Sequence, residues 1–97
     1  MTKQETMTKN KFPLGQVVAT PAAVAMLERN NVEPSTLLDL HAGLHSPELC
    51  EEDQQANREA VECGDRVVSS YTVAGTKLFV ITEWDRSVTT VLLADEY

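Results

Sequence analysis

The chain has 97 residues with a formal net charge of −7, and its 42% hydrophobic and 24% charged content is that of one small globular domain. Residues 1–11 carry three lysines against one glutamate (+2), so residues 12–97 carry five basic and fourteen acidic side chains (−9). A body this acidic repels a phosphate backbone, so we expect no direct nucleic-acid binding. The sequence has no apolar run of about 20 residues and no apolar core of a secretory signal near its start, so we expect a cytoplasmic protein without a membrane span.

Two segments are distinguished at the start of the chain. Residues 1–11 lack apolar periodicity and are predicted to form a flexible tail, whereas residues 12–97 are predicted to form a single α+β domain. Residues 15–19 are a candidate short strand. A helix is predicted directly after them, because Thr20 and Pro21 have the residue types preferred at the N-cap and at the first helical position.

Two further helices are predicted before the C-terminal third of the chain. The second begins at Pro34 and runs to about His41. The third is predicted from Pro47 to Glu62, because Ser46 again supplies a cap hydroxyl before a proline. Its polar face is expected to present a broad acidic surface to water. The carboxylates of this surface are Glu48, Glu51, Glu52, Asp53, Glu59 and Glu62.

The segment from Lys77 to Leu93 predicts an antiparallel hairpin, because two β-branched and aromatic runs flank a short polar turn. With Trp84–Ser87 as the loop, Val80 lies opposite Val91. A strand at Asp65–Val73 precedes the hairpin, so the three strands are predicted to form an antiparallel meander. We expect the three N-terminal helices to pack on one face of this meander, with residues 15–19 as a candidate fourth strand. The predicted core wall is formed by Leu78, Val80, Thr82, Thr89, Val91 and Leu93.

The tip of the hairpin is the first candidate functional site. It places two carboxylates, a guanidinium, a hydroxyl and an indole next to one another, and turn formation does not require the indole. An exposed tryptophan beside an arginine is typical of an interface anchor. The alternative is that the aspartate and the serine form the turn and that Arg86 pairs with a neighbouring carboxylate. The predicted partner-binding residues are Glu83, Trp84, Asp85, Arg86 and Ser87.

A second candidate site consists of His41, His45 and Cys50, whose spacing suits zinc. Gly43 is expected to break the helix between the two histidines, so they are not predicted to share one face. The sequence contains no CxxC or HExxH pair, no phosphate-binding glycine pattern and no G-x-S-x-G motif. We therefore predict no enzymatic activity, no metal and no cofactor, and we keep a small metal-dependent domain as an alternative.

Several stretches of the sequence resemble a known family. They are GQVVATPAA at 15–23, LCEED at 49–53 with Ala56 and Asn57, and LFVITE at 78–83 running into DRSVTT at 85–90. The family comprises small, uncharacterised proteins of bacterial plasmids and integrated mobile elements, some labelled plasmid-related proteins and others type I restriction subunits. The sequence departs from the family pattern at residues 44–47, at Phe79 and at Trp84. The resemblance implies a bacterial, cytoplasmic setting and no established activity.

Three functional hypotheses follow from these observations. The first is an interaction module of a mobile element that binds a host or plasmid protein. The second is a DNA mimic, in which the carboxylates of the third helix stand in for phosphates and inhibit a host-defence or DNA-binding enzyme. The third is a homodimer that forms through a sheet edge, because no residue pattern at the ends of the meander indicates a capped edge.

Overall fold

The computed structural model describes residues 11–97. The predicted tail therefore lies outside the described residues, except for Lys11, whose backbone N–H donates to the Ala42 carbonyl at 2.8 Å. The elements of the described chain are, in order, β1 (Gln16–Ala19), α1 (Pro21–Arg29), α2 (Pro34–Ala42), α3 (Glu51–Cys63), β2 (Val67–Val73), β3 (Thr76–Thr82), β4 (Val88–Leu93) and the short 3-10 helix η1 (Ala94–Glu96).

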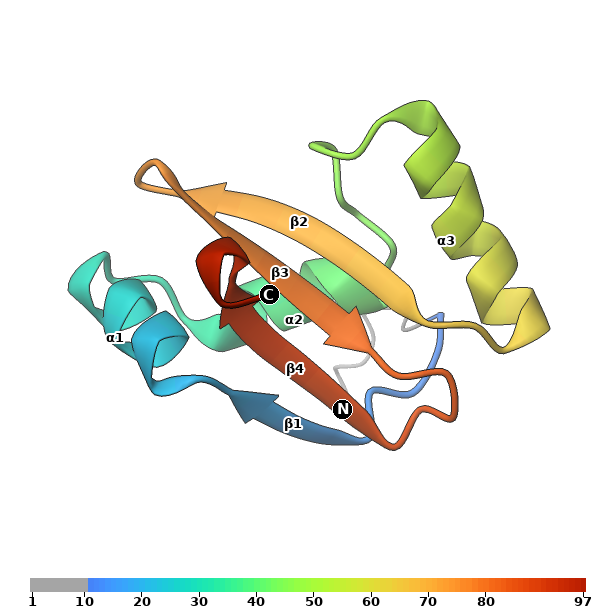
Figure 1. The fold of residues 1–97 in the computed structure, drawn as a ribbon, viewed down its shortest axis with the longest axis horizontal. Coiled ribbons are helices and arrows are strands. Elements are labelled where there is room, and N and C mark those ends of the chain that lie inside the picture. The colour runs from blue at the N-terminus through green and yellow to red at the C-terminus, as the bar shows by residue number, and fades with distance from the viewer. Residues whose placement is uncertain (1–10) are drawn as a thin grey trace, which may run out of the picture.

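The four strands form one mixed sheet in the order β1-β4-β3-β2 (Figure 1). Strands β2, β3 and β4 are the predicted antiparallel meander. Strand β1 lies parallel to β4, with Gln16 opposite Val88 and Ala19 opposite Val91. The predicted α+β class and the candidate fourth strand at residues 15–19 are confirmed, but the purely antiparallel, three-stranded sheet is wrong, because the sheet has four strands and one parallel pair. The reason is that β1 pairs with the edge of β4 that the meander alone leaves unpaired.

The hairpin between β3 and β4 has the predicted register, with Val80 opposite Val91 and Thr82 opposite Thr89. The Glu83 N–H donates to the Val88 carbonyl at 3.0 Å and closes the loop. A slip of one residue would move every side chain to the other face, so this register places the predicted wall against the core. The fully buried members of that wall are Leu78, Val80, Thr82, Thr89 and Val91.

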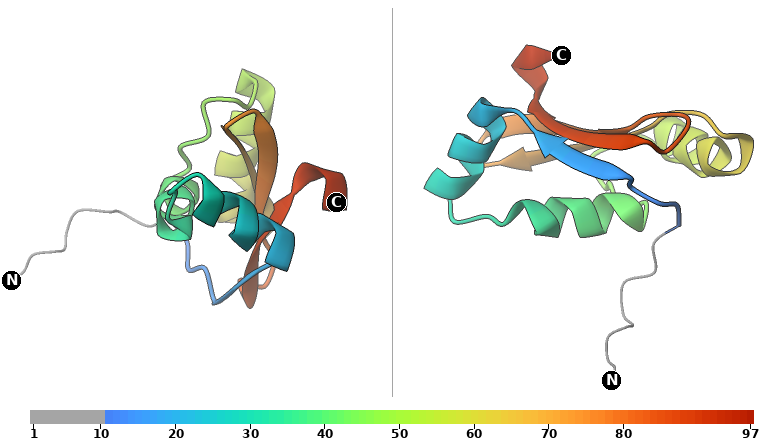
Figure 2. Two further views of the ribbon diagram at one scale, coloured as in Figure 1. Left: turned by 90° about the vertical axis from the view of Figure 1, so that its left-hand side faces the viewer. Right: turned by 90° about the horizontal axis from the view of Figure 1, so that it is seen from below.

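Helices α1 and α2 cover one face of the sheet, as Figure 2 shows. Helix α1 begins at Pro21 as predicted, and the Thr20 hydroxyl oxygen accepts a hydrogen bond from the Ala23 N–H at 3.2 Å. The expectation that all three helices share this face is wrong, because α3 lies beside the β2 edge (Figures 1 and 2). The main core cluster consists of Ala23, Met26, Leu27, Leu37, Tyr71, Leu78, Val80 and Val91.

The third helix begins at Glu51 rather than at the predicted Pro47. The predicted cap, Ser46, instead contacts β2: its hydroxyl donates to the Ser70 carbonyl and accepts from the Ser70 N–H, both at 3.1 Å. Cys50 stands at the N-cap position without a side-chain capping bond. A hydroxyl that satisfies two backbone groups of a strand edge stabilises more than one that satisfies a single helix N–H, which explains the later helix start.

The outer edge of β2 is closed by side chains instead of by another strand. The Asn57 amide donates to the Val68 carbonyl at 2.7 Å and accepts from the Val68 N–H at 3.2 Å. The Glu48 carboxylate accepts from the Thr72 N–H at 2.6 Å and from the Thr72 hydroxyl at 2.8 Å. Together with Ser46, these side chains satisfy alternate residues along the strand, which are the ones whose backbone groups point outward. The expectation that the meander has no capped edge is therefore wrong.

Replacing Asn57 with leucine should reopen this edge near the start of β2. The variant leaves the Val68 N–H and carbonyl without their partners, so we expect a loss of about 1–3 kcal/mol in the free energy of unfolding, measured by urea denaturation. We also expect association at high concentration in light scattering. The control is Gln55→Leu, which also replaces a side-chain amide with leucine, but at an exposed position of α3, and should cost about 0.5 kcal/mol or less. Equal losses in the two variants would contradict the edge-closing role of Asn57.

Candidate functional site

Arg86, in the turn between β3 and β4, faces the protein rather than solvent. Its guanidinium donates to the carbonyl oxygens of Ala60 at 2.9 Å, Asp65 at 2.6 Å and Glu83 at 3.2 Å. It also lies 5.4 Å from the centroid of the Phe12 ring. The first two carbonyls lie at the C-terminal end of α3 and just after it, so Arg86 ties the turn to that helix end. The expected pairing with a neighbouring carboxylate is wrong, and the guanidinium is engaged within the protein.

Three other residues of the predicted tip also have internal contacts. The Glu83 carboxylate pairs with Arg66 at 3.4 Å. The Asp85 carboxylate accepts from the Ser87 hydroxyl at 2.6 Å and from the Ser87 N–H at 3.1 Å. These bonds stabilise the charged form and lower the pKa of Asp85 below its ordinary value. The aspartate and the serine therefore form the turn itself, as the simpler interpretation of the sequence predicts.

Trp84 is the one residue of the tip without such a role. Its side chain is 66% exposed, and the indole makes no hydrogen bond within residues 11–97. It is the only tryptophan of the chain. The residues around it are held by Arg86 and Asp85, so the indole is presented from a turn of defined shape. Of the predicted five-residue site, one exposed aromatic side chain thus remains available for contact, on a turn held in place by internal hydrogen bonds.

In the second candidate site, His41 belongs to a buried chain of side-chain hydrogen bonds. The Thr89 hydroxyl donates to the Leu14 carbonyl at 2.7 Å, so it must accept from Thr82, 2.7 Å away. Thr82 then accepts from Nε2–H of His41 at 2.8 Å. In the neutral ring Nδ1 has no proton, so it accepts from the Ser69 hydroxyl at 2.7 Å. Counting hydrogens in this way assigns the Nε2–H tautomer to the neutral ring of His41.

His41 is fully buried, with its ring edge-on to Phe12 at 5.3 Å between centroids. Burial, and then the positive charge of Arg86, lower the pKa of His41 to about 4. His41 is therefore neutral and buried near the C-terminal end of α2. Both ring nitrogens are hydrogen-bonded, while His45 and Cys50 are exposed on the surface. The structure does not bring the three together, and residues 11–97 contain no group of three His, Cys, Asp or Glu side chains placed to hold a metal.

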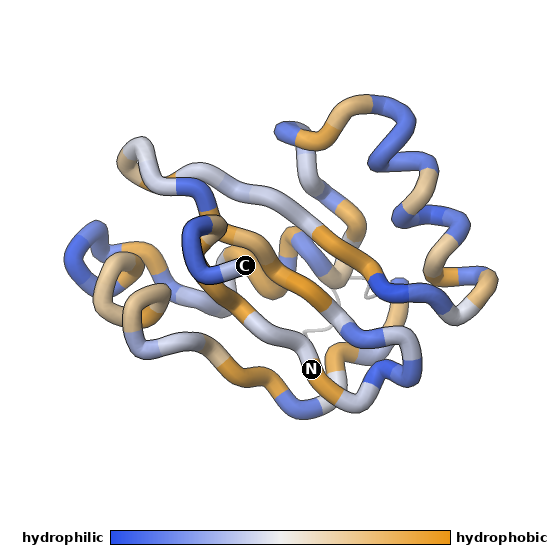
Figure 3. Tube along the Cα trace, viewed as in Figure 1, coloured by the Kyte–Doolittle hydropathy of each residue, from blue (hydrophilic) through white to orange (hydrophobic). Residues whose placement is uncertain are grey.

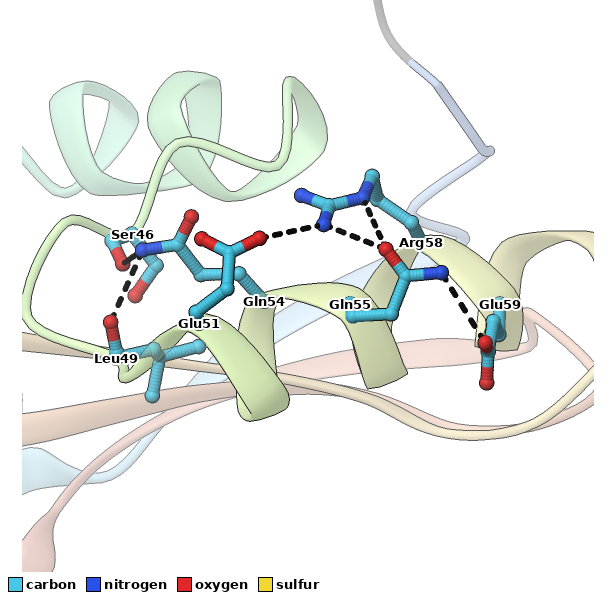
Figure 4. Close-up of polar contacts among 7 residues, drawn as sticks. All are labelled: Ser46, Leu49, Glu51, Gln54, Gln55, Arg58 and Glu59. Carbon is cyan, nitrogen blue, oxygen red and sulfur yellow. Dashed lines mark hydrogen bonds and ion pairs between the residues drawn. The ribbon is translucent and has the colours of Figure 1, made fainter.

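The predicted acidic surface is less uniform than the sequence indicates. Glu48 is turned to the β2 edge. Arg58 contacts Glu51 at 3.1 Å, and Gln55 donates to Glu59 at 3.1 Å (Figure 4). Helix α3 is hydrophilic along most of its length, as Figure 3 shows, but its face mixes a cation and amides with carboxylates. The exposed members of the predicted surface whose carboxylates make no hydrogen bond with the described residues are Glu52, Asp53 and Glu62.

Two features of the site are absent from the sequence prediction. One is the buried chain through His41, although the predicted register already placed the hydroxyls of Thr82 and Thr89 opposite each other, which is a pairing that favours a hydrogen bond. The other is the inward role of Arg86, for which the sequence offers no local signal. Its partners at the end of α3 are brought to the turn only by folding.

Within residues 11–97 no helix is long and apolar enough to cross a membrane. Comparisons of the chain with protein-family models, with the curated proteins and with the solved structures found no match. The geometry of the hairpin tip is therefore the main basis for a functional proposal.

Proposed function

We propose that the protein is a protein–protein interaction module that uses Trp84 as its anchor. The observation that carries this proposal is an indole that is 66% exposed on a turn whose other side chains are engaged internally. Exposed tryptophans cost solvation energy, and they are the residues most enriched at binding hot spots. A turn can be built without one, so the side chain is better explained by a contact with another molecule.

The internal hydrogen bonds that fix the turn also support a binding role for Trp84. Arg86 fixes the turn to the end of α3, and Asp85 closes it through Ser87. A side chain presented from a fixed backbone loses little conformational entropy on binding, so more of its burial energy appears as affinity. The tip therefore has both components of an anchor, a large apolar group and a preorganised support.

The class of partner follows from charge and from the family resemblance. Residues 12–97 carry a net charge of −9, which favours a partner with a basic surface around the pocket for the indole. The resemblance to proteins of plasmids and integrated elements favours a host or plasmid protein of a bacterial cytoplasm. A DNA mimic receives less support, since Glu48 and Glu51 of the acidic surface are engaged within the protein.

The experiment is affinity capture from a bacterial lysate with matched baits, followed by binding measurements on the purified partner. The baits are the native protein, Trp84→Ala and Leu40→Ala, which removes an exposed large apolar side chain (36%) on α2. We expect a protein retained by the first and the third bait, with an affinity for Trp84→Ala lower by roughly 30-fold or more. A partner bound equally by all three baits would contradict the role of Trp84.

Trp84→Ala should leave the stability of the protein almost unchanged. The side chain is mostly in water and makes no hydrogen bond within residues 11–97, so we expect a change of about 0.5 kcal/mol or less in urea denaturation followed by circular dichroism. Because Trp84 is the only tryptophan, its fluorescence in the native protein should resemble that of a solvated indole and shift to shorter wavelength when the partner binds. A large loss of stability would show that the indole is a structural residue.

A further inference from the structure

The two edges of the sheet differ in whether their outward backbone groups have partners. The β2 edge is closed by side chains, whereas β1 forms the other edge and no strand of residues 11–97 lies beyond it. The N–H groups of Gln16 and Thr20 point to β4, donating to the carbonyls of Ser87 and Val91, both at 3.0 Å. Alternate residues of a strand point in opposite directions. The N–H and carbonyl groups of Val17 and Ala19 therefore point away from β4, towards the outside of the sheet.

The side chains of β1 make this edge apolar as well as unpaired. Val17 is 44% exposed and Val18 is 39% exposed, and the strand contains no charged residue. Figure 3 shows the apolar stretch along β1 at the border of the sheet. Proteins usually protect such an edge with a charge, a proline or a bulge, and β1 has none of these within its span. Within residues 11–97 this edge is available to another extended strand.

We propose that this strand is β1 of a second copy, paired antiparallel about a two-fold axis that passes through Val18. In this arrangement Val17 forms a hydrogen-bonded pair with Ala19 of the second copy, and the reverse pair is related by symmetry. Val18 lies opposite Val18 of the second copy in a non-hydrogen-bonded pair, the type in which the two side chains are closer together. The product is one continuous sheet in the order β2-β3-β4-β1-β1-β4-β3-β2, with both outer edges closed by side chains.

The structure selects this register among those that keep the outward groups paired. An axis through Val17 would require Gly15 to pair as an extended residue, but Gly15 has a φ of +67°, and a Cβ there would clash with the Arg86 carbonyl. An axis through Ala19 would require an N–H from Pro21, which has none. Only the axis through Val18 uses outward groups that all lie inside the strand.

A second copy fits this edge better than an unrelated strand for two reasons. The strand is its own complement in the antiparallel sense, which is the condition for a closed two-fold interface. It is also uncharged, so the net charge of −7 on each copy lies outside the paired strands. Salt therefore screens the repulsion between the two copies. The strand is only four residues long, so its interface is small and we expect a dissociation constant on the order of 10–100 µM. Raising the salt concentration should tighten the dimer.

Sedimentation velocity over a range of concentrations tests the proposal. The native protein should move from 10.7 kDa towards twice that mass, while Val18→Lys, which places like charges opposite each other on the axis, should stay a monomer. The matched control is Leu40→Lys, which changes a side chain of similar exposure (36%) on α2 by the same charge and should dimerise like the native protein. A native mass of 10.7 kDa up to about 0.5 mM would overturn the proposal, since the expected dissociation constant lies well below that concentration. It would leave residues 1–10 or a strand of another protein as the occupant.

Cysteine cross-linking tests the register. In a background with Cys50 and Cys63 replaced by serine, Val18→Cys should form a disulfide-linked dimer, because directly opposed residues of an antiparallel pair lie within disulfide distance. Val17→Cys should cross-link at least about tenfold more slowly, because its counterpart in the second copy is displaced along the strand. Equal rates for the two variants would overturn the register. Because these measurements do not involve Trp84, their failure would not bear on the proposed partner contact.

Discussion

Lowering the pH from about 6.5 to about 4 should reduce the free energy of unfolding by about 3 kcal/mol through His41. Burial and the charge of Arg86 lower the pKa of His41 to about 4 in the folded protein, whereas the unfolded chain has the ordinary value of 6.5. In this window the unfolded state binds a proton that the folded state does not. The stabilisation from neutral His41 is therefore complete above pH 6.5 and is lost as the pH falls. Below pH 4 both states bind the proton, so no further stability is lost through His41. Urea denaturation at a series of pH values measures it.

Variants at the histidines assign this pH dependence. His41→Leu cannot titrate and should lose the slope, with a stability at pH 7 lower by roughly 2–5 kcal/mol, because the hydroxyls of Ser69 and Thr82 lose their buried partner. Thr82→Ser keeps the hydroxyl and should keep the slope. His45→Gln changes the exposed histidine and should also keep it. A slope that persists in His41→Leu would show that another group is responsible.

Arg86→Ala should cost roughly 2–4 kcal/mol, more than any other substitution at the hairpin tip. The variant removes charge-assisted hydrogen bonds to the carbonyls of Ala60 and Asp65, and it uncovers the ring of Phe12. Because those bonds join the turn to the end of α3, hydrogen exchange at the last turn of that helix should accelerate together with the loss of global stability. Urea denaturation and amide exchange provide the two measurements.

The control for Arg86 is Arg66, the residue just before β2. Arg66→Ala removes a partly exposed ion pair with Glu83, and such pairs contribute at most about 1 kcal/mol. Arg86→Lys keeps the charge but loses the fork that reaches two separate carbonyls, so its stability should lie between those of the native protein and Arg86→Ala. If Arg86→Ala were no less stable than Arg66→Ala, the contacts of Arg86 would not be structural.

The same experiments affect how the tip is tested for binding. A loss of partner binding in Arg86→Ala would not show a direct contact, because the variant also changes the support of the turn. Trp84→Ala does not have this problem, since the indole makes no hydrogen bond within residues 11–97. Of the five residues predicted as a contact, Trp84 is therefore the informative one to replace.

Local patterns in the sequence predicted a large part of the fold. Thr20 and Pro21 mark the start of α1, and the β-branched runs around Trp84–Ser87 define the hairpin with its correct register. These features depend on residues within a few positions of one another, so capping, turn chemistry and alternation are sufficient to find them. The exposure of Trp84 also follows from its place in a tight turn.

Tertiary structure alone decided the features whose partners are distant in the chain. Ser46 lies 24 residues from Ser70, Arg86 lies 26 residues from Ala60, and His41 lies 41 residues from Thr82. The sequence suggests a local role for each side chain: a helix cap for Ser46, an ion pair with a neighbouring carboxylate for Arg86, and a site shared with His45 and Cys50 for His41. In the folded protein each instead satisfies backbone or buried polar groups that have no other partner, which stabilises more than the local alternative. The open edge of β1 was decided in the same way, because its parallel pairing with β4 becomes apparent only in the assembled sheet.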